Sequence, residues 1–343
     1  DLLERALAAV IERHESLRTV FVEHEGETRQ KILPPRELDF QIDYRDLSQT
    51  PEARSVADAE LVRFRQLPFN FQDGPLCKAL LCRLEKGRYL LGLNIHHIVF
   101  DDWSFEIMSH EMAIHYRALL KGQGSPLRPL EFQYKEMAAW MNTELSGERL
   151  LAQEKFWLDK LAAPLPVLEL TTEFPRPALK TFKGAKARYT NEAELIDAIR
   201  RVSQREGVSV FMTLTTALLV QLHRYSGQKE LILGLPVAGR GLLELENQVG
   251  FYTNTVSLLT RWEEDLRLSD FLQLVIENML DVYRHQLYPL DALVEQLDRR
   301  VDQSRGALFD LLVVYKKVTE GGEPLDLPFS IQIEEAKQLH SGF

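Results

Sequence analysis

The order of hydrophobic and polar positions predicts helices and strands mixed along the whole chain. Near the start, Leu2, Ala6 and Val10 recur on one face of a helix, and residues 13–21 run from that helix into a strand. Residues 25–27 have the form of a hairpin turn. Further runs predict strands over 30–33, 40–44, 76–84 and 88–95 and helices over 52–66, 132–145 and 149–161, with another helix after Ser104.

Residues 163–184 interrupt this pattern, because they hold five prolines or glycines and show no helical period. Apolar periodicity begins again after them. It predicts strands over 185–189, 231–237, 256–259 and 308–314 and helices over 192–205, 208–225, 268–285 and 290–297.

Helices and strands thus occur in both halves, without the strict alternation that a parallel sheet needs. We predict an α/β protein of the α+β type with two lobes. Each lobe should hold a mixed or mostly antiparallel sheet backed by helices. We expect an N-terminal lobe over 1–165, a crossing linker over 166–184, and a C-terminal lobe over 185–343 that is incomplete at its end.

Composition narrows the class of protein. The 343 residues suffice for two domains with buried cores. The net charge of -10 argues against a nucleic-acid partner, because binding to phosphates needs a basic surface. No apolar run approaches the ~20 residues that cross a bilayer, and no signal peptide opens the sequence. We therefore expect a globular, cytoplasmic protein that does not enter a membrane.

The two cysteines and the two ends of the sequence add two expectations. Cys77 and Cys82 lie five positions apart on one predicted strand, so they should point to opposite faces and form neither a disulfide nor a metal site. This suits a reducing compartment and a protein without a metal. The sequence opens inside an amphipathic helix and stops at 339–343 without a terminating feature, so we expect it to be part of a longer chain.

The stretch 94–104 holds the strongest candidate chemistry. It begins at the end of an apolar strand and ends at the start of a helix. His96 and His97 are neighbours on the predicted strand, so they should point to opposite faces, with one of them in any given cleft. Asp101 follows just before the helix. A histidine titrates near neutral pH, and a nearby carboxylate can fix its orientation or hold the loop through an arginine.

The same stretch also fits a structural role. In that interpretation the two histidines are buried at a strand end and Asp101 caps the next helix. Short motifs of this kind also occur by chance, so the rest of the chain has to decide between the two interpretations.

Six segments of the chain decide between the chemical and the structural interpretation. Their sequences are R-H-E-S-L-R-T-V-F at 13–21, H-H-I-V-F-D-D-W-S at 96–104, Y-K-E-M-A-A-W at 134–140, V-G-F-Y-T-N-T at 249–255, H-Q-L-Y-P-L-D at 285–291 and D-Q-S-R-G-A-L at 302–308. In this order they resemble the motifs of the condensation domain of nonribosomal peptide synthetases, a member of the chloramphenicol-acetyltransferase-like superfamily. The family's first motif, an N-terminal strand with S-x-A-Q-x-R, and its final stretch are absent, which fits truncation at both ends.

The resemblance implies a fold and a reaction. Two lobes would form a V-shaped pseudo-dimer around a tunnel. A donor and an acceptor carrier protein would each insert a 4'-phosphopantetheine arm, and the acceptor's aminoacyl amine would attack the donor's thioester to form an amide. The partners implied are these peptidyl carrier proteins and an adjacent adenylation domain of the same synthetase. No cofactor would be bound by the domain itself, and no metal.

The resemblance also implies roles for single residues. His97 would be the catalytic histidine, as a base or as the group that positions the amine, and His96 would be structural. Asp101 would hold the loop through a buried arginine, for which Arg13, Arg18 and Arg305 are the candidates. The supporting or tunnel residues would be His96, Asp102, Ser104, Arg13, Arg18, Trp157, Asn254 and Arg305.

Asp102 is the main departure from the family pattern, which usually has glycine there. A glycine would indicate a positive φ or a close approach of backbone to substrate. Aspartate tolerates the left-handed region and can cap the following helix, so the fold should survive. The added side chain and its charge would narrow the tunnel or change which acceptor fits.

Trp157 and Asn254 have two interpretations each. Trp157 matches a family tryptophan near the lobe junction, but its helical spacing favours packing in the core over lining the tunnel. Asn254 either faces the tunnel or serves turn chemistry.

Three functions remain open from the sequence. The first is an amide-forming condensation domain. The second is a related epimerization or acyltransferase domain, although Trp103, Ser104 and residues 13–21 favour condensation. The third is a non-catalytic module that recruits carrier proteins or tailoring enzymes. A cyclization domain is disfavoured, because in that family the first histidine is replaced by aspartate.

Overall fold

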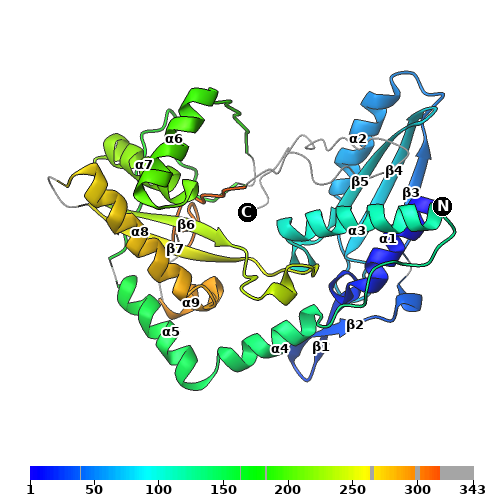
Figure 1. Ribbon diagram of the computed structural model, residues 1–343, viewed down its shortest axis with the longest axis horizontal. Coiled ribbons are helices and arrows are strands. Elements are labelled where there is room, and N and C mark those ends of the chain that lie inside the picture. The colour runs from blue at the N-terminus through cyan, green and yellow to red at the C-terminus, as the bar shows by residue number, and fades with distance from the viewer. Residues whose placement is uncertain (39, 163, 182–183, 263–265, 298–301, 317–343) are drawn as a thin grey trace. The chain divides into compact units, whose positions relative to one another are not determined.

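The computed structural model describes residues 1–38, 40–162, 164–181, 184–262, 266–297 and 302–316 (Figure 1). These residues form two compact units. The first unit contains Asp1–Met141 and Arg240–Tyr252, and the second contains Asn142–Gly239 and the described part of Thr253–Thr319. The last part of the predicted C-terminal lobe, residues 317–343, lies outside the described residues.

The division into units follows packing rather than sequence order. Residues 142–165 belong to the second unit because Trp157 and Leu161 are part of its core. Residues 240–252, which we call the strap, belong to the first unit although the chain on both sides of them belongs to the second. The lobe boundaries at 165 and 185 stay a prediction.

The first unit is built from a hairpin, a three-stranded sheet and four helices. Its strands are β1 (Thr19–His24), β2 (Glu27–Ile32), β3 (Ile42–Asp46), β4 (Cys77–Glu85) and β5 (Arg88–Ile95). Its α-helices are α1 (Leu2–Arg13), α2 (Ala53–Arg65), α3 (Asp102–Leu120) and most of α4 (Tyr134–Glu144), whose last turn falls in the second unit. The short 3-10 helices are η1 (Glu15–Arg18), η2 (Pro35–Glu37), η3 (His97–Val99) and, in the strap, η4 (Leu243–Leu245).

The sheet β3-β4-β5 is mixed, with β3 parallel and β5 antiparallel to β4. Alternate residues of β4 serve different cores. Cys77 and Ala79 pack with α1 and α3, whereas Leu80 and Cys82 pack with α2 on the other face. This follows from the two-residue period of a strand. The two cysteines therefore face opposite ways, both buried and unpaired.

The β1–β2 hairpin turns at Glu25 and Gly26, which both have positive φ, 54° and 80°. Two such residues make the turn whose twist matches the flanking strands, and glycine adopts it without cost. The sequence prediction of a turn at this point is confirmed.

The second unit contains a β-hairpin surrounded by helices. Its strands are β6 (Glu230–Val237) and β7 (Asn254–Arg261), paired antiparallel. Its helices are α5 (Gly147–Lys160), α6 (Ala193–Glu206), α7 (Val210–Ser226), α8 (Leu268–Arg284) and α9 (Leu290–Gln296). The core lies between the hairpin and α8, around Leu233, Leu258 and Phe271; Figure 1 shows α8 running along the two strands.

The mixed α/β class predicted from the sequence is confirmed, and most elements lie within a few residues of their predicted bounds. Two predicted strands are wrong. Residues 185–189 have no regular structure, and 308–314 form a single parallel bridge, Gly234 to Leu312, instead of a strand. The helices of the described residues are all too short or too polar to span a lipid bilayer.

Candidate active site

The two histidines lie just beyond the strand that was predicted to carry them. β5 ends at Ile95. His96, at φ -70° and ψ 133°, is the N-cap of η3, and His97 is the first residue of that helix. The prediction that strand alternation separates the two rings is therefore wrong in its cause, because neither residue belongs to the strand. The turn into η3 sets their directions instead.

His96 packs into an aromatic group. Its ring meets Phe71 at 4.7 Å and Phe69 at 5.4 Å between centroids, both edge to face. Its Nδ1 accepts a hydrogen bond of 3.1 Å from the backbone N–H of Ile98. Burial, with a smaller contribution from the nearby His97, lowers the pKa of His96. A ring held in this way caps η3 and favours the neutral form.

His97 is exposed, in contrast to His96. Its ring lies 5.1 Å from the ring of Phe251, with an angle of 82° between the two planes. Phe251 belongs to the strap. The imidazole is thus accessible on one side and in contact with an aromatic ring on another.

Asp101 stands at the start of α3 and is buried, with 2% of its surface exposed. As the N-cap of α3 it accepts a 2.8 Å hydrogen bond from the backbone N–H of Ser104. The Ser104 hydroxyl lies 2.6 Å from the same oxygen and 2.9 Å from the carbonyl of Gly250, and can donate its one proton to either. Capping fixes the geometry of the turn between His97 and the helix.

The positive charge that faces Asp101 is Arg240, in the strap. Its Nη2 lies 3.0 and 3.2 Å from the two carboxylate oxygens, and both side chains are 1% exposed. Arg240 also donates 2.6 Å hydrogen bonds from Nη1 to the carbonyls of Leu245 and Gln248, and its guanidinium lies 4.0 Å from the ring of Tyr252. Burial lowers the pKa of Arg240 and Asp101 opposes this, so the guanidinium stays charged.

The arginines proposed from sequence as partners of Asp101 have other partners, so that prediction is wrong. Arg13 binds Glu111 through Nε at 2.9 Å. Arg18 donates to the carbonyl of Leu33 at 2.7 Å. Arg305, in the second unit, is ion-paired with Asp310 and donates to the carbonyl of Leu168. Each bonds to groups within its own unit, and this leaves Arg240 as the partner of Asp101.

Three successive residues of the strap are bound to the first unit, two of them to this turn and the middle one to α4. The backbone N–H of Gly250 donates to the Ser104 hydroxyl at 3.0 Å, and that of Tyr252 donates to Asp101 at 3.1 Å. Between them, the carbonyl of Phe251 accepts a 2.8 Å bond from the Tyr134 hydroxyl. A Cβ on Gly250 would lie 2.6 Å from the Tyr134 ring, so glycine permits this close approach.

Asp102 begins α3 with helical backbone, and it is not among the described residues with positive φ. The left-handed conformation considered from the family's glycine is therefore not required here, and Asp101 provides the cap. The Asp102 side chain is exposed in the first turn, where a negative charge is favourable.

A second charged cluster lies behind the site. Glu111 of α3 binds Arg13 through one oxygen and His14 Nε2, at 2.7 Å, through the other. The N–H of Val249 donates to His14 Nδ1 at 3.3 Å, so the proton of a neutral ring is on Nε2. Burial acts to raise the pKa of Glu111, but the bond from His14 and the charge of Arg13 outweigh it and lower that pKa.

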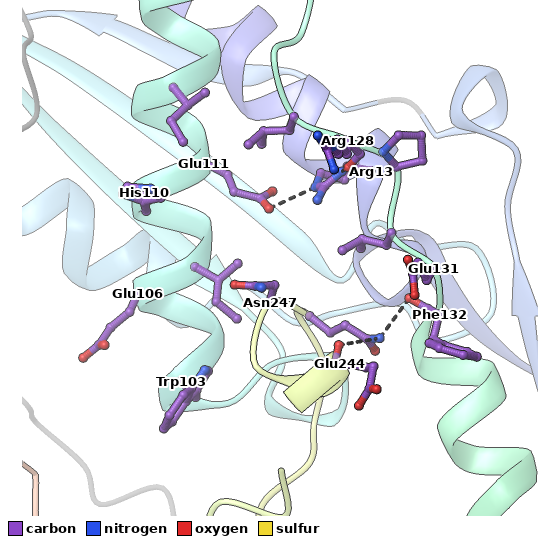
Figure 2. Close-up of a pocket in the computed structure, with 16 residues that line it drawn as sticks. Arg13, Trp103, Glu106, His110, Glu111, Arg128, Glu131, Phe132, Glu244 and Asn247 are labelled. Atoms are coloured by element: carbon purple, nitrogen blue, oxygen red, sulfur yellow. Dashed lines mark hydrogen bonds and ion pairs between the residues drawn. The ribbon is translucent and has the colours of Figure 1, made fainter. Parts of the chain in front are cut away.

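A cavity of about 580 Å³ opens beside this cluster (Figure 2). Its walls come from α3, from residues 127–132 and from the strap. Figure 2 shows the Arg13–Glu111 pair on one side of the cavity and Trp103 at the N-terminal end of α3. The Trp103 indole donates a 2.9 Å hydrogen bond to the carbonyl of Glu246. His97 does not line this cavity.

Trp157 and Asn254 both have structural contacts in the second unit. Trp157 is 1% exposed, and its indole donates 3.0 Å to the carbonyl of His285. The Asn254 amide donates to the carbonyls of Gln286 and Tyr288 at 2.7 and 2.8 Å. These bonds join the start of β7 to the segment before α9.

Arg240 and Phe251 are the residues of the site that sequence reasoning missed. Phe251 lies in the segment 249–255 that carried part of the resemblance, so a signal existed. Arg240 lies in the loop Ala238–Gly241 and had no motif of its own; a buried aspartate that needs a partner was the available clue.

Comparison with known proteins identifies the family. The model of the condensation domain matches residues 1–343. The chain is 33% identical over 339 residues to bacitracin synthase 2 of Bacillus licheniformis, covering 96% of this chain but 12% of that protein. It is 34% identical over 343 residues to tyrocidine synthase 3 of Brevibacillus parabrevis, covering 98% of this chain and 5% of that protein. The sequence therefore spans a small part of these relatives.

Solved structures share the fold. The X-domain from teicoplanin biosynthesis has a TM-score of 0.80 at 22% identity, over 91% of this chain and 69% of that one; in its complex with OxyB the TM-score is 0.78, with 91% and 68% covered. The first condensation domain of the calcium-dependent antibiotic synthetase, in complex with a substrate analogue, has a TM-score of 0.70 at 21% identity, over 87% and 68%.

The mixed α/β fold, the family model and the similarity to peptide synthetases together define the class of protein. This chain belongs to the condensation-domain family of nonribosomal peptide synthetases.

Proposed function

We propose that this chain is an active condensation domain that forms an amide bond. The amine of a carrier-bound aminoacyl group attacks the carbonyl of a carrier-bound acyl or peptidyl thioester, and the thiol of the donor arm leaves. Donor and acceptor peptidyl carrier proteins deliver the substrates on 4'-phosphopantetheine arms. The family and the synthetase relatives support these partners and an adjacent adenylation domain.

The reaction needs alignment of the reactants more than a strong enzyme nucleophile. A thioester is already activated, so the amine can attack it directly. The two cysteines are poor candidates for a covalent intermediate. Both are buried, and burial raises the pKa of the Cys77 thiol to about 12 and also raises that of Cys82.

The observation that carries the proposal is the contrast between His97 and Asp101. The imidazole is exposed, whereas the carboxylate four residues later is 2% exposed and paired with Arg240. His97 can therefore meet an amine whose pKa is about 8, to orient it or accept its proton. Asp101 is a positioning residue that holds the turn.

A non-catalytic docking role is the second candidate. One fold relative, the X-domain from teicoplanin biosynthesis, is known in complex with OxyB, so this fold can present a surface to another protein. In that case this chain would recruit a carrier protein or a tailoring enzyme, and the histidine pair would have no chemical role.

An assay with loaded carrier proteins separates these functions. It uses the complete natural polypeptide that contains this sequence, with donor and acceptor carriers charged, and measures the amide product. We expect His97→Ala to reduce product formation by about 10²-fold or more. His24→Ala removes an exposed histidine at the end of β1 and should leave the rate unchanged.

Equal product from wild type and His97→Ala would refute a catalytic role of this histidine. No product from the wild type, together with retained binding of a carrier protein, would support the docking function.

A further inference from the structure

We propose that Phe251 is a positioning residue whose ring restricts the imidazole of His97 to its reactive orientation. The proposal rests on the proposed function, because it assigns a partner to the catalytic histidine. It also predicts a physical contact in solution that can be measured without any substrate.

The contact between the two rings has the geometry of a favourable aromatic pair. The centroids are 5.1 Å apart and the planes meet at 82°, which is edge to face. His97 is exposed at the start of a three-residue helix, so its imidazole can be reached from the solvent side. The ring of Phe251 lies against the imidazole on another side and limits the rotamers that it can adopt there.

The ring of Phe251 is itself held in place by its backbone. The carbonyl of Phe251 accepts from the Tyr134 hydroxyl, the N–H of Gly250 donates to Ser104, and the N–H of Tyr252 donates to Asp101. Three successive residues of the strap are thus fixed to the first unit. The side chain between them is 38% exposed and meets His97 without being buried in a core.

Asp101 connects the two sides of this arrangement. Through Oδ1 it caps the helix that follows His97, and through Oδ2 it binds the residue that follows Phe251. The same carboxylate therefore links the backbone that follows His97 to the backbone that follows Phe251. This gives the strap a direct role at the reactive group, in addition to its role in neutralising Asp101 through Arg240.

The consequence is a specific pattern of kinetic effects. Removal of the ring should leave His97 present but less well oriented, so kcat should fall while binding of the carriers is retained. An aromatic pair contributes the equivalent of about a three- to tenfold change in an equilibrium. We expect kcat to fall by roughly that factor in Phe251→Ala and Phe251→Leu. Phe251→Tyr keeps the ring and should restore the wild-type rate.

The experiment measures kcat and KM for both loaded carriers in the complete polypeptide, and the ring proton chemical shifts of His97 by NMR in histidine-labelled protein. Phe132→Ala is the matched control, since it removes another exposed phenylalanine of the same unit. We expect the His97 ring protons to move in Phe251→Ala and Phe251→Leu but not in Phe132→Ala, because a ring at this distance shifts them. Phe251→Leu keeps apolar volume and covers the case in which the alanine variant is unstable.

The outcomes separate the two proposals. Unchanged His97 shifts in Phe251→Leu, or a kcat equal to that of Phe132→Ala, would overturn the role of Phe251 while leaving catalysis by His97 intact. If His97→Ala has no effect on product but the shifts move as expected, the contact is real and the proposed catalytic role of His97 fails.

Discussion

Asp101 and Arg240 carry opposite charges on side chains that are each 1% exposed. Such a pair gains little net stability over apolar residues, since both charges lose their hydration. Loss of one partner is costly, because the other charge then stays buried alone. Here the carboxylate also accepts bonds from Ser104 and Tyr252, so several groups lose a partner together.

We predict that Asp101→Ala lowers the free energy of unfolding by about 3–5 kcal/mol, measured by urea denaturation at neutral pH. Asp101→Asn and Arg240→Met should each also be destabilising. The double variant Asp101→Asn with Arg240→Met should cost less than the sum of these two single variants, because no charge is left unpaired. Arg261→Ala breaks the exposed pair with Glu230 and should cost no more than about 1 kcal/mol. An Asp101→Ala cost as small as that of Arg261→Ala would contradict the buried pair.

The lowered pKa of Glu111 predicts that the stability of the fold depends on pH. Its pKa is lowered, because the bond from His14 and the charge of Arg13 outweigh the opposing effect of burial. A carboxyl with a depressed folded-state pKa stabilises the fold above its unfolded value, ordinarily 4.5, and loses that contribution as the pH falls through the folded-state pKa. The wild type should therefore lose stability in acid partly through Glu111.

We expect Glu111→Gln to be less stable than wild type at pH 7 and to depend less on pH below about 4.5. Urea unfolding from pH 7 to pH 3 measures both effects. Glu106→Gln, on the exposed face of the same helix, is the control. Parallel pH curves for Glu111→Gln and wild type would rule out this assignment.

At the scale of elements, α3 is the helix that contacts both the strap and the core of the first unit. Its N-terminus carries the cap by Asp101 and the hydroxyl of Ser104, and its middle carries Glu111. On its apolar side Met108 and Met112 pack against α1 and β4. The start of α3 therefore lies between β5, which ends just before the histidines, and the strap, which is bound to Ser104.

The Ser104 hydroxyl links the helix to the strap, so its removal tests that link. Ser104→Ala leaves the N–H of Gly250 without its acceptor, and we expect a loss of about 1–3 kcal/mol in urea unfolding. Ser109→Ala, on the same helix, should change stability by no more than about 0.5 kcal/mol. Similar stability of both variants would mean that the bond to the strap contributes nothing.

For the molecule as a whole, the two compact units do not follow the order of the chain. The strap packs on the first unit, while the residues before and after it form β6 and β7 of the second. In the intact chain Arg240 is linked to the rest of the strap, which is itself bound to the first unit through Gly250 and Tyr252. A break in the strap should therefore weaken the first unit, although residues 1–141 stay intact.

A cleavable site placed between Gly241 and Leu242 tests this dependence. After cleavage, the amides of α3 should exchange hydrogen at least about tenfold faster, because Arg240 is no longer tethered from both sides. The control cleavage lies between Pro177 and Ala178, in an exposed segment of the second unit without helix or strand. Equal exchange in α3 after both cleavages would show that the tether is unimportant.

The sequence predicted most of the elements because their signals are local. The alternation of Cys77 and Cys82 between two faces, the turn at Glu25 and Gly26, and the helix after Ser104 all follow from spacings of a few residues. Where the local signal was weak, as at 185–189 and 308–314, the predicted strands were wrong. The bounds of β5 were predicted correctly, but the two histidines were assigned to that strand, because the cap and first residue of a 3-10 helix leave no mark in the apolar periodicity.

The sequence by itself determined the family, through six ordered segments, and the pair of residues His97 and Asp101 at the proposed site. Only the tertiary structure decided that Arg240 neutralises Asp101 and that Phe251 meets His97. These partners lie more than a hundred residues from the groups they contact. Local periodicity says nothing about contacts at that separation, which depend on where packing and burial bring the strap.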